Sequence, residues 1–198
     1  MQFNTKERNV FVCSDPHYSH KNLIKSLSTW KSGAHRDFKS VNHHNDTLVN
    51  NINKTVGKDD VLFLLGDVAF GGFENVRLFM DRIICDEVHL ILGNHDKHIQ
   101  TNRDNIQKCF TSIHTRLDVY IDGEMFILDH YPIREWEGCH KGTYQLYGHQ
   151  HNLPEARFSN GTGRTMDVGF DGHPEFRPYN VRTEIFPLLK NREFTIHH

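Results

Sequence analysis

The chain has 198 residues, of which 37% are hydrophobic and 24% charged, and its formal net charge is −2. This composition is typical of a folded globular protein and argues against binding nucleic acid through a strongly basic surface. No stretch approaches the roughly 18 apolar residues of a membrane-spanning helix, and no linker rich in Pro, Gly or Ser divides the chain. We therefore expect one domain over residues 1–198, located in the cytoplasm because the first residues lack the apolar centre of a signal peptide.

Four cysteines stand apart in the sequence, with no Cys-x-x-Cys spacing. This pattern predicts neither a disulfide framework nor a thiolate zinc site, and we expect the cysteines to be reduced. Histidine is the unusual residue, because there are 16 of them and several fall in short polar turns. Those turns are the first candidates for a functional site.

Three apolar runs in the first half of the chain are each followed by a short polar turn. Runs of this length that are rich in branched residues are typical of buried strands. In the first turn, Pro16 disfavours the right-handed helical region for Asp15, so we expect Asp15 and His17 to project from extended backbone. The runs and their turns are 9–14 with Asp15-Pro16-His17, 60–65 with Gly66-Asp67, and 88–92 with Gly93-Asn94-His95-Asp96.

Helices are predicted between these strands from apolar residues at helical spacing. In the second helix we place His43 and His44 on the solvated face, and in the third an apolar stripe from Val76 to Ile84 faces the core. Residues 30–40 have the composition of a polar loop. Alternating strands and helices predict an α/β layered fold. The predicted helices cover about residues 21–29, 42–55 and 73–85, and residues 97–110 form a helix or a long loop.

The second half of the chain is predicted to begin with an antiparallel hairpin. Asp122-Gly123 separates two strand-like runs and is a strong signal for a tight turn between paired strands. Two later turns again carry histidines. The predicted strands of this half are 117–121, 124–128 followed by His130, 144–147 followed by His149 and His151, 165–169, and an alternating edge segment at 181–186.

Acidic, amide and imidazole groups thus follow five of the predicted strands. Each turn alone has an ordinary explanation, because Asp and Asn favour turns and a lone histidine is more often structural than a ligand. Their joint occurrence indicates a metal site of oxygen and nitrogen donors, which suit Mn, Fe, Zn or Ni, and more than four ligands indicate two ions. The residues are Asp15, His17, Asp67, Asn94, His95, His130, His149 and His151.

As an ordered set, Asp-x-His, Gly-Asp, Gly-Asn-His-Asp, an isolated His and Gly-His-x-His resemble the calcineurin-like metallophosphoesterases over residues 13–151. The resemblance implies an α/β fold, a four-layer α/β/β/α sandwich of two mixed sheets flanked by helices. It also implies two divalent transition-metal ions at the strand ends, with Mn ahead of Fe, Ni and Zn. Carried over by motif position, one ion is held by Asp15, His17, Asp67 and His151, and the other by Asp67, Asn94, His130 and His149, with Asp67 bridging them.

The same resemblance implies roles for residues that are not ligands. The two cations would make hydroxide available near neutral pH, and His95 would act as the acid or stabilise the transition state. Phe70 stands where protein phosphatases have an aspartate that orients this histidine, so Asp96 either orients His95 or braces the turn. Arg134 either grips a phosphate or is an exposed loop arginine. Further candidates near the site, each equally explained as structural, are His20, Asp167 and His173.

The function predicted from these motifs is hydrolysis of a small phosphodiester or nucleotide rather than a phosphoprotein, as in the smaller bacterial and phage-type members of the family. A metal-dependent nuclease is the alternative within the enzymes, although the charge does not support it. A catalytically silent binding scaffold of the same fold is the alternative outside them. The loops that would choose the substrate, at 31–41, 97–115 and 134–142, carry no readable motif.

Overall fold

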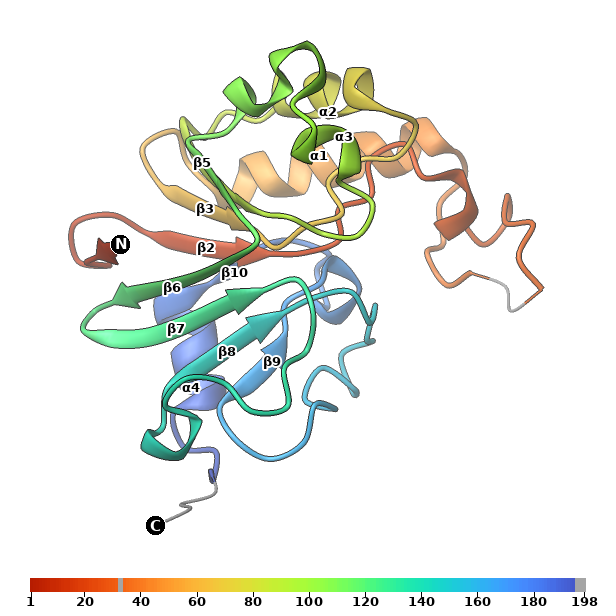
Figure 1. The fold of residues 1–198 in the computed structure, drawn as a ribbon. Helices are drawn as coiled ribbons and strands as arrows, with labels where there is room; N and C mark the ends of the chain where they lie inside the picture. Colours follow the sequence, from red (N-terminus) through yellow and green to blue (C-terminus); the bar gives the residue numbers. More distant parts are fainter. Residues whose placement is uncertain (32–33, 195–198) are drawn as a thin grey trace.

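The computed structural model describes residues 1–31 and 34–194. Two five-stranded sheets lie face to face, and each contains both parallel and antiparallel pairs. Three helices cover the outer face of one sheet, and the short α4 lies beside the other (Figure 1). This confirms the α/β class with two mixed sheets flanked by helices. Among the described residues, no helix is long and apolar enough to cross a membrane.

The first sheet has the order β10-β2-β3-β4-β5, in which the last four strands run parallel. Parallel strands place their carboxyl ends at the same edge of the sheet, so the three polar turns after β2, β3 and β4 are brought together. The strands are β2 (Val10–Cys13), β3 (Val61–Leu64), β4 (Glu87–Ile91), β5 (Ser112–His114) and the antiparallel edge strand β10 (Tyr179–Asn180).

The second sheet has the order β1-β6-β7-β8-β9. The predicted hairpin is confirmed, since β6 and β7 pair in antiparallel register around Asp122 and Gly123, whose φ angles are 52° and 84°. Strands β7 and β8 are parallel, so their carboxyl ends also share one edge. The strands are β1 (Gln2–Phe3), β6 (Arg116–Ile121), β7 (Glu124–Asp129), β8 (Tyr144–Tyr147) and β9 (Thr165–Asp167).

Helix α1 confirms the predicted helix over 42–55. Ser40 accepts a hydrogen bond from the backbone N–H of His43, which caps the helix start. His43 is exposed as expected, but the surface position expected for His44 is wrong, because this side chain is 0% exposed and its Nε2 lies 3.0 Å from Arg36 Nη1. The helices are α1 (Val41–Thr55), α2 (Phe73–Met80), α3 (Lys97–Gln100) and α4 (Phe186–Leu189), with a 3₁₀ segment at Arg103–Cys109.

The segment before α1 departs most from the predicted helices. Instead of a helix over 21–29, the chain forms a 3₁₀ turn at Lys21–Leu23, and Ile24 then pairs with Arg36 in a parallel bridge. The N–H of Lys25 donates to the carbonyl of Arg36 at 2.9 Å, which fixes this pairing. Pairing between distant residues therefore outweighs the local helical spacing.

Two further elements differ from the prediction. Helix α2 ends at Met80, so Ile84 is 47% exposed and does not continue the core-facing stripe. The segment 181–186 is not an edge strand, because Val181–Ile185 forms a π-helix whose start is capped by the Asn180 side chain. The edge strand β10 lies just before it.

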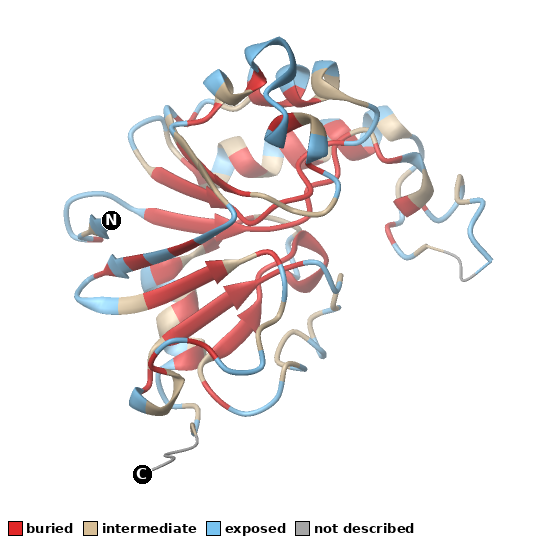
Figure 2. Ribbon diagram, in the orientation of Figure 1, coloured by how far each residue is buried: buried red, intermediate tan, exposed pale blue. Residues whose placement is uncertain are grey.

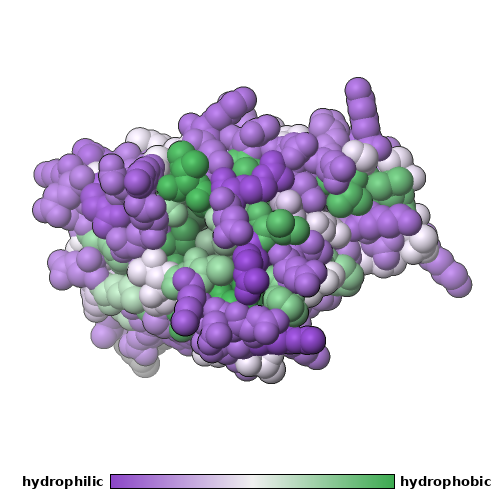
Figure 3. Space-filling view, turned by 90° about the horizontal axis from the view of Figure 1, so that it is seen from above, coloured by the Kyte–Doolittle hydropathy of each residue, from purple (hydrophilic) through white to green (hydrophobic). Residues whose placement is uncertain are grey.

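Two hydrophobic cores hold the layers together. One lies between the first sheet and its helices and the other between the two sheets. Strands β2, β3, β4, β8 and β9 are buried along most of their length, whereas β6 alternates between buried and exposed residues (Figure 2). Seen from above, the helix-covered face is mainly hydrophilic, with small hydrophobic patches between polar side chains (Figure 3). Burial on both faces of the first sheet explains why its strands read as continuous apolar runs.

Candidate metal centre

The predicted ligands come together at the shared edge of the two sheets. Several of them have positive φ angles, which are uncommon for residues other than glycine and cluster at functional sites. The extended backbone expected for Asp15 and His17 is therefore wrong. The left-handed turn instead aims both side chains into the same space. The positive φ angles are 56° at Asp15, 50° at His17, 55° at Asp67, 69° at His149 and 51° at His151.

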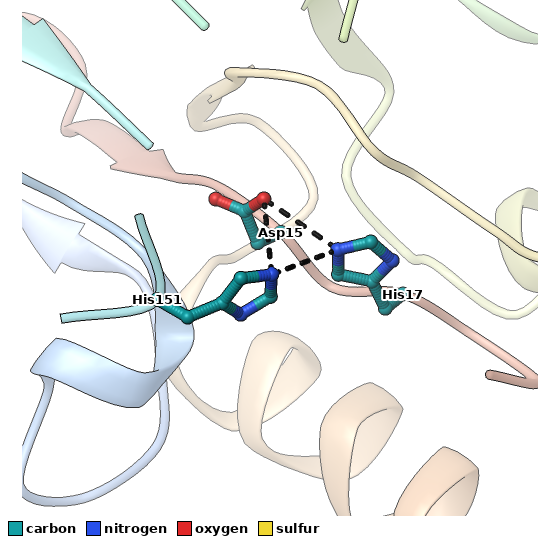
Figure 4. A group of neighbouring side chains, drawn as sticks. All are labelled: Asp15, His17 and His151. Atoms are coloured by element: carbon teal, nitrogen blue, oxygen red, sulfur yellow. Dashed lines mark hydrogen bonds and ion pairs between the residues drawn. The ribbon is translucent and has the colours of Figure 1, made fainter. Parts of the chain in front are cut away.

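One group consists of Asp15, His17 and His151, whose side chains point toward one another (Figure 4). The two histidine Nε2 atoms lie 3.2 Å apart, and Asp15 Oδ1 is 3.6 Å and 3.8 Å from them. Asp15 Oδ1 is buried without a hydrogen-bond partner. Because buried polar atoms are normally satisfied, an orphaned carboxylate oxygen facing two imidazole nitrogens fits a cation site.

The protonation of these imidazoles also fits a cation. The Nδ1–H of His151 donates to Asp171 Oδ2 at 2.8 Å, so its Nε2 presents a lone pair. Burial lowers the pKa of His17 to about 3 and keeps this imidazole neutral, and its Nδ1 lies 3.3 Å from Nδ1 of His20. Burial raises the pKa of Asp15, but the nearby imidazoles of His17, His151 and His130 outweigh it and lower the pKa, so Asp15 stays ionised.

A second group consists of Asp67, His130 and His149, with Asn94 beside it. The Nδ1–H of His130 donates to the Leu65 carbonyl at 2.7 Å, so its Nε2 is an acceptor when the ring is neutral. This Nε2 lies 3.0 Å from Asn94 Oδ1. Two acceptors at this distance are stabilised by a positive charge between them, as in metal sites whose histidines are fixed through the other nitrogen.

Asp67 lies between the two groups. Its Oδ2 is 3.5 Å from His17 Nε2 and 3.6 Å from His130 Nε2. Its Oδ1 instead accepts the backbone N–H of His95 at 2.9 Å, so one carboxylate oxygen, rather than two, faces both groups. Burial raises the pKa of Asp67 to about 6, because the charged carboxylate is unfavourable away from water. Bound divalent cations would offset this unfavourable free energy.

Glycines allow the turns to pack this closely. A Cβ at Gly93 would overlap Asp67 Oδ1, and a Cβ at Gly148 would overlap Ser14 Oγ and Asp15 Oδ2. Alanine at either position would therefore displace a predicted ligand carboxylate. Steric contact thus explains why the Gly-Asn-His-Asp and Gly-His-x-His motifs have glycine at these positions.

His95 and Asp96 follow Asn94 but face different surroundings. His95 has a 41% exposed side chain that lines a cavity of about 540 Å³, and its Nε2 is 4.0 Å from Asp67 Oδ2. Asp96 is 1% exposed and accepts hydrogen bonds from the backbone N–H groups of Asp67, Val68 and Gly93. Among the described residues, none of its hydrogen bonds goes to the His95 ring. Asp96 therefore has the contacts of a brace between two turns and not those of an orienting group.

A family model described as calcineurin-like phosphoesterase matches residues 8–163. The chain belongs to this family. The chain is 26% identical to an uncharacterized protein of Methanocaldococcus jannaschii over 83% of its own length and 82% of that protein. It is 27% identical to the Gene 66 protein of Mycobacterium phage L5 over 92% of its own length and 95% of that protein.

A solved structure is similar as well. It is a protein of unknown function from Aquifex aeolicus, with a TM-score of 0.69 and coverage of 92% of this chain and 100% of that chain. At 20% identity, this likeness shows the fold alone. The family match supports metal-dependent phosphoester hydrolysis, and the two groups of side chains are the candidate metal sites.

Arg134 does not line the cavity beside the candidate metal centre. It is exposed and lines a separate cavity of about 580 Å³ together with Trp136 and Asn160. Among the described residues, the cavity beside the candidate ligands contains no arginine. Its exposure agrees with the alternative of an exposed loop arginine, and a phosphate-binding role for Arg134 stays a prediction.

Two buried residues that the motifs did not indicate support the candidate metal site. Asp171 holds His151, and Arg36 donates to both Asp171 oxygens at 2.8 Å and 2.7 Å as well as to the backbone carbonyl of Asp15. Burial raises the pKa of Asp171, but the Arg36 charge together with the hydrogen bonds from His151, His35 and Arg36 outweighs it and lowers the pKa, so Asp171 is ionised. Asp171 could have been found from the sequence as an acidic residue that follows the predicted strand 165–169. Arg36 could not, because it lies in a loop without a motif.

Of the three further candidates, His20 lies in the candidate site, whereas Asp167 and His173 have structural contacts. His20 contacts His17 directly and lines the cavity. Asp167 is buried and accepts the backbone N–H groups of Gly169 and Asn152, so it fixes the turn that follows β9. His173 bonds Glu184, away from the candidate ligands.

Proposed function

We propose that this protein is a binuclear metal-dependent phosphoesterase that hydrolyses a small phosphodiester or nucleotide. The observation that supports this most strongly is the position of Asp67 Oδ2, within 3.6 Å of a histidine nitrogen from each ligand group. A carboxylate in that position is suited to bridge two cations. The complete set of converging donors favours a catalyst over a silent scaffold of the same fold.

The ligands divide between two sites that share Asp67. When bound, two divalent cations supply an activated water molecule and neutralise the phosphoryl oxygens. We propose Mn²⁺ ahead of Fe, Ni and Zn, because carboxylate, amide and imidazole donors without thiolate suit these ions. The proposed ligands are Asp15, His17, Asp67 and His151 in one site and Asp67, Asn94, His130 and His149 in the other.

His95 is the proposed proton donor. Its ring lines the cavity rather than the protein interior, and the backbone N–H bond to Asp67 Oδ1 ties its position to the bridging carboxylate. As the ester P–O bond breaks, the Nε2–H of His95 gives its proton to the leaving oxygen. Asp96 takes no part in proton transfer and keeps the two turns together. We also propose a cytoplasmic location, because four free cysteines suit a reducing compartment.

The test is hydrolysis of bis(p-nitrophenyl) phosphate by the purified protein with Mn²⁺. We expect turnover by the wild type and a loss of at least 100-fold in kcat for His95→Ala, since a general acid contributes about 10²–10⁴-fold. Asn94→Ala should also lower the rate by weakening one metal site. His43→Ala is the matched control, because His43 is an exposed histidine on α1. Equal rates for the wild type, Asn94→Ala and His95→Ala would refute the proposal.

A further inference from the structure

One wall of the cavity beside the candidate metal centre is aromatic. Trp30, His20 and Phe70 line this side, and we call them the aromatic wall. Trp30 is 44% exposed and Phe70 40% exposed, although both are large hydrophobic residues. Leu23 lines the same cavity but is only 4% exposed, so the apolar surface open to a ligand here comes mainly from rings.

The rings of the aromatic wall are packed in a fixed order. His20 stacks on Phe70 with ring centroids 4.0 Å apart and an interplanar angle of 5°. Trp30 meets His20 edge-on at 5.5 Å and 82°. Because His20 is 5% exposed and held by both neighbours, it supports the two exposed rings rather than offering its own surface. The wall is thus assembled before any ligand binds.

The aromatic wall is continuous with the candidate metal centre. His20 lies 5.1 Å, between ring centroids, from the proposed ligand His17. On the other side, Phe70 lies 5.6 Å from the ring of His95. A ligand that rests on Trp30 or Phe70 therefore places its next chemical group near the metal ligands and the proposed proton donor.

We infer that the aromatic wall binds the nucleobase of a nucleoside phosphoester whose phosphoryl group lies at the metal centre. This inference rests on the proposed function and names its substrate class. A nucleotide combines the required features, a flat ring system and a phosphoryl group separated by one sugar. Bases of any sequence stack on aromatic side chains, and a cavity of about 540 Å³ lies within the usual range for small-molecule sites.

The kinetic test compares two esters with the same leaving group. Thymidine 5′-(p-nitrophenyl phosphate) carries a base, and methyl p-nitrophenyl phosphate does not. With Mn²⁺, we expect Trp30→Ala and Phe70→Leu to lower kcat/KM roughly tenfold or more for the thymidine ester, mainly through KM, because a stacked base contributes that much. The methyl ester, which has no base, should lose much less kcat/KM than the thymidine ester in both variants. Phe70→Tyr keeps the ring and should restore the thymidine rate.

The binding test does not depend on turnover. The chain has two tryptophans, Trp30 and the buried Trp136, so stacking on Trp30 should quench part of the intrinsic fluorescence. In the presence of Mn²⁺, AMP should quench it and bind at least tenfold more tightly than ribose 5-phosphate, which has the same phosphate and no base. Trp30→Phe should abolish the signal. Tyr120→Ala is the matched control, because Tyr120 is an exposed aromatic residue on β6 and does not line the cavity.

The outcomes separate the inference from the proposed function. If both esters are hydrolysed but AMP and ribose 5-phosphate bind equally and the wall variants change both esters alike, the base site is refuted and the phosphoesterase stands. If neither ester is hydrolysed but AMP binds selectively through Trp30 and Phe70, the base site stands and the phosphoesterase is refuted. Selective binding together with selective loss of the thymidine reaction supports both.

Discussion

Asp171 determines which nitrogen of His151 faces the candidate centre. Its Oδ2 takes the proton of Nδ1, and Arg36 in turn holds both oxygens of Asp171. A carboxylate behind a ligating histidine fixes the ring and raises its basicity. The same three-part arrangement occurs away from the centre, where Glu184 bonds both His173 and Arg177.

Asp171→Asn should lower the affinity for Mn²⁺ by about 10- to 100-fold, because His151 loses the carboxylate that orients it. Glu184→Gln is the control for loss of a comparable contact to a histidine and an arginine, and we expect it to leave metal affinity unchanged. Calorimetric titration of metal-free protein measures both. An Asp171→Asn protein that is folded and binds Mn²⁺ as tightly as the wild type would show that the contact does not serve the site.

Much of the site could be predicted at the residue scale, because motif order assigns residues to strand ends. All predicted metal ligands lie at the shared sheet edge, whereas Arg134 lies in another cavity. Arg36 could not be found from the sequence, since its importance comes from packing against Asp171, which is far away in the chain. The exposure of Phe70 beside His95 likewise depends on how the loop before α1 folds.

At the scale of elements, local patterns predicted those strands and helices that local interactions specify. The hairpin β6–β7 has a turn whose residues favour left-handed backbone, and α1 has both a cap and an apolar stripe. The helix predicted over 21–29 was wrong because Ile24 pairs with Arg36, and no local sequence pattern encodes this pairing. The strands β1 and β5 were missed because each has only two or three residues.

Asp96 joins two elements, since its carboxylate accepts backbone N–H groups from the turns after β3 and β4. Asp96→Ala should lower the free energy of unfolding by about 3 kcal/mol, because it leaves buried donors unsatisfied. The control is Asp118→Ala on β6, whose 43% exposed side chain predicts a change within about 0.5 kcal/mol. Urea unfolding measures both. A stable Asp96→Ala protein with an altered pH profile for kcat would instead support an orienting role.

At the scale of the whole molecule, we propose that residues 1–198 form one domain. The core between the sheets contains residues from both halves of the chain, including Val10 from β2 and Phe126 from β7. Neither sheet can bury this face without the other. Metal ligands from both sheets would add a further link, because His17 and His151 follow strands of different sheets.

Thermal unfolding should therefore be a single cooperative transition, with the same midpoint by circular dichroism and by tryptophan fluorescence. Mn²⁺ should raise the midpoint, since the ligands converge only in the folded state. The matched control is Mn²⁺ added to Asp67→Asn, for which the shift should be smaller. Two separate transitions, one for each probe, would contradict the single domain.

A pair of cations bridged by Asp67 is tested most directly by electron paramagnetic resonance of metal-free protein titrated with Mn²⁺. We expect two Mn²⁺ ions bound per chain and the spectrum of a spin-coupled pair, which Asp67→Asn should abolish. Uncoupled Mn²⁺, or saturation at a single ion per wild-type chain, would contradict it.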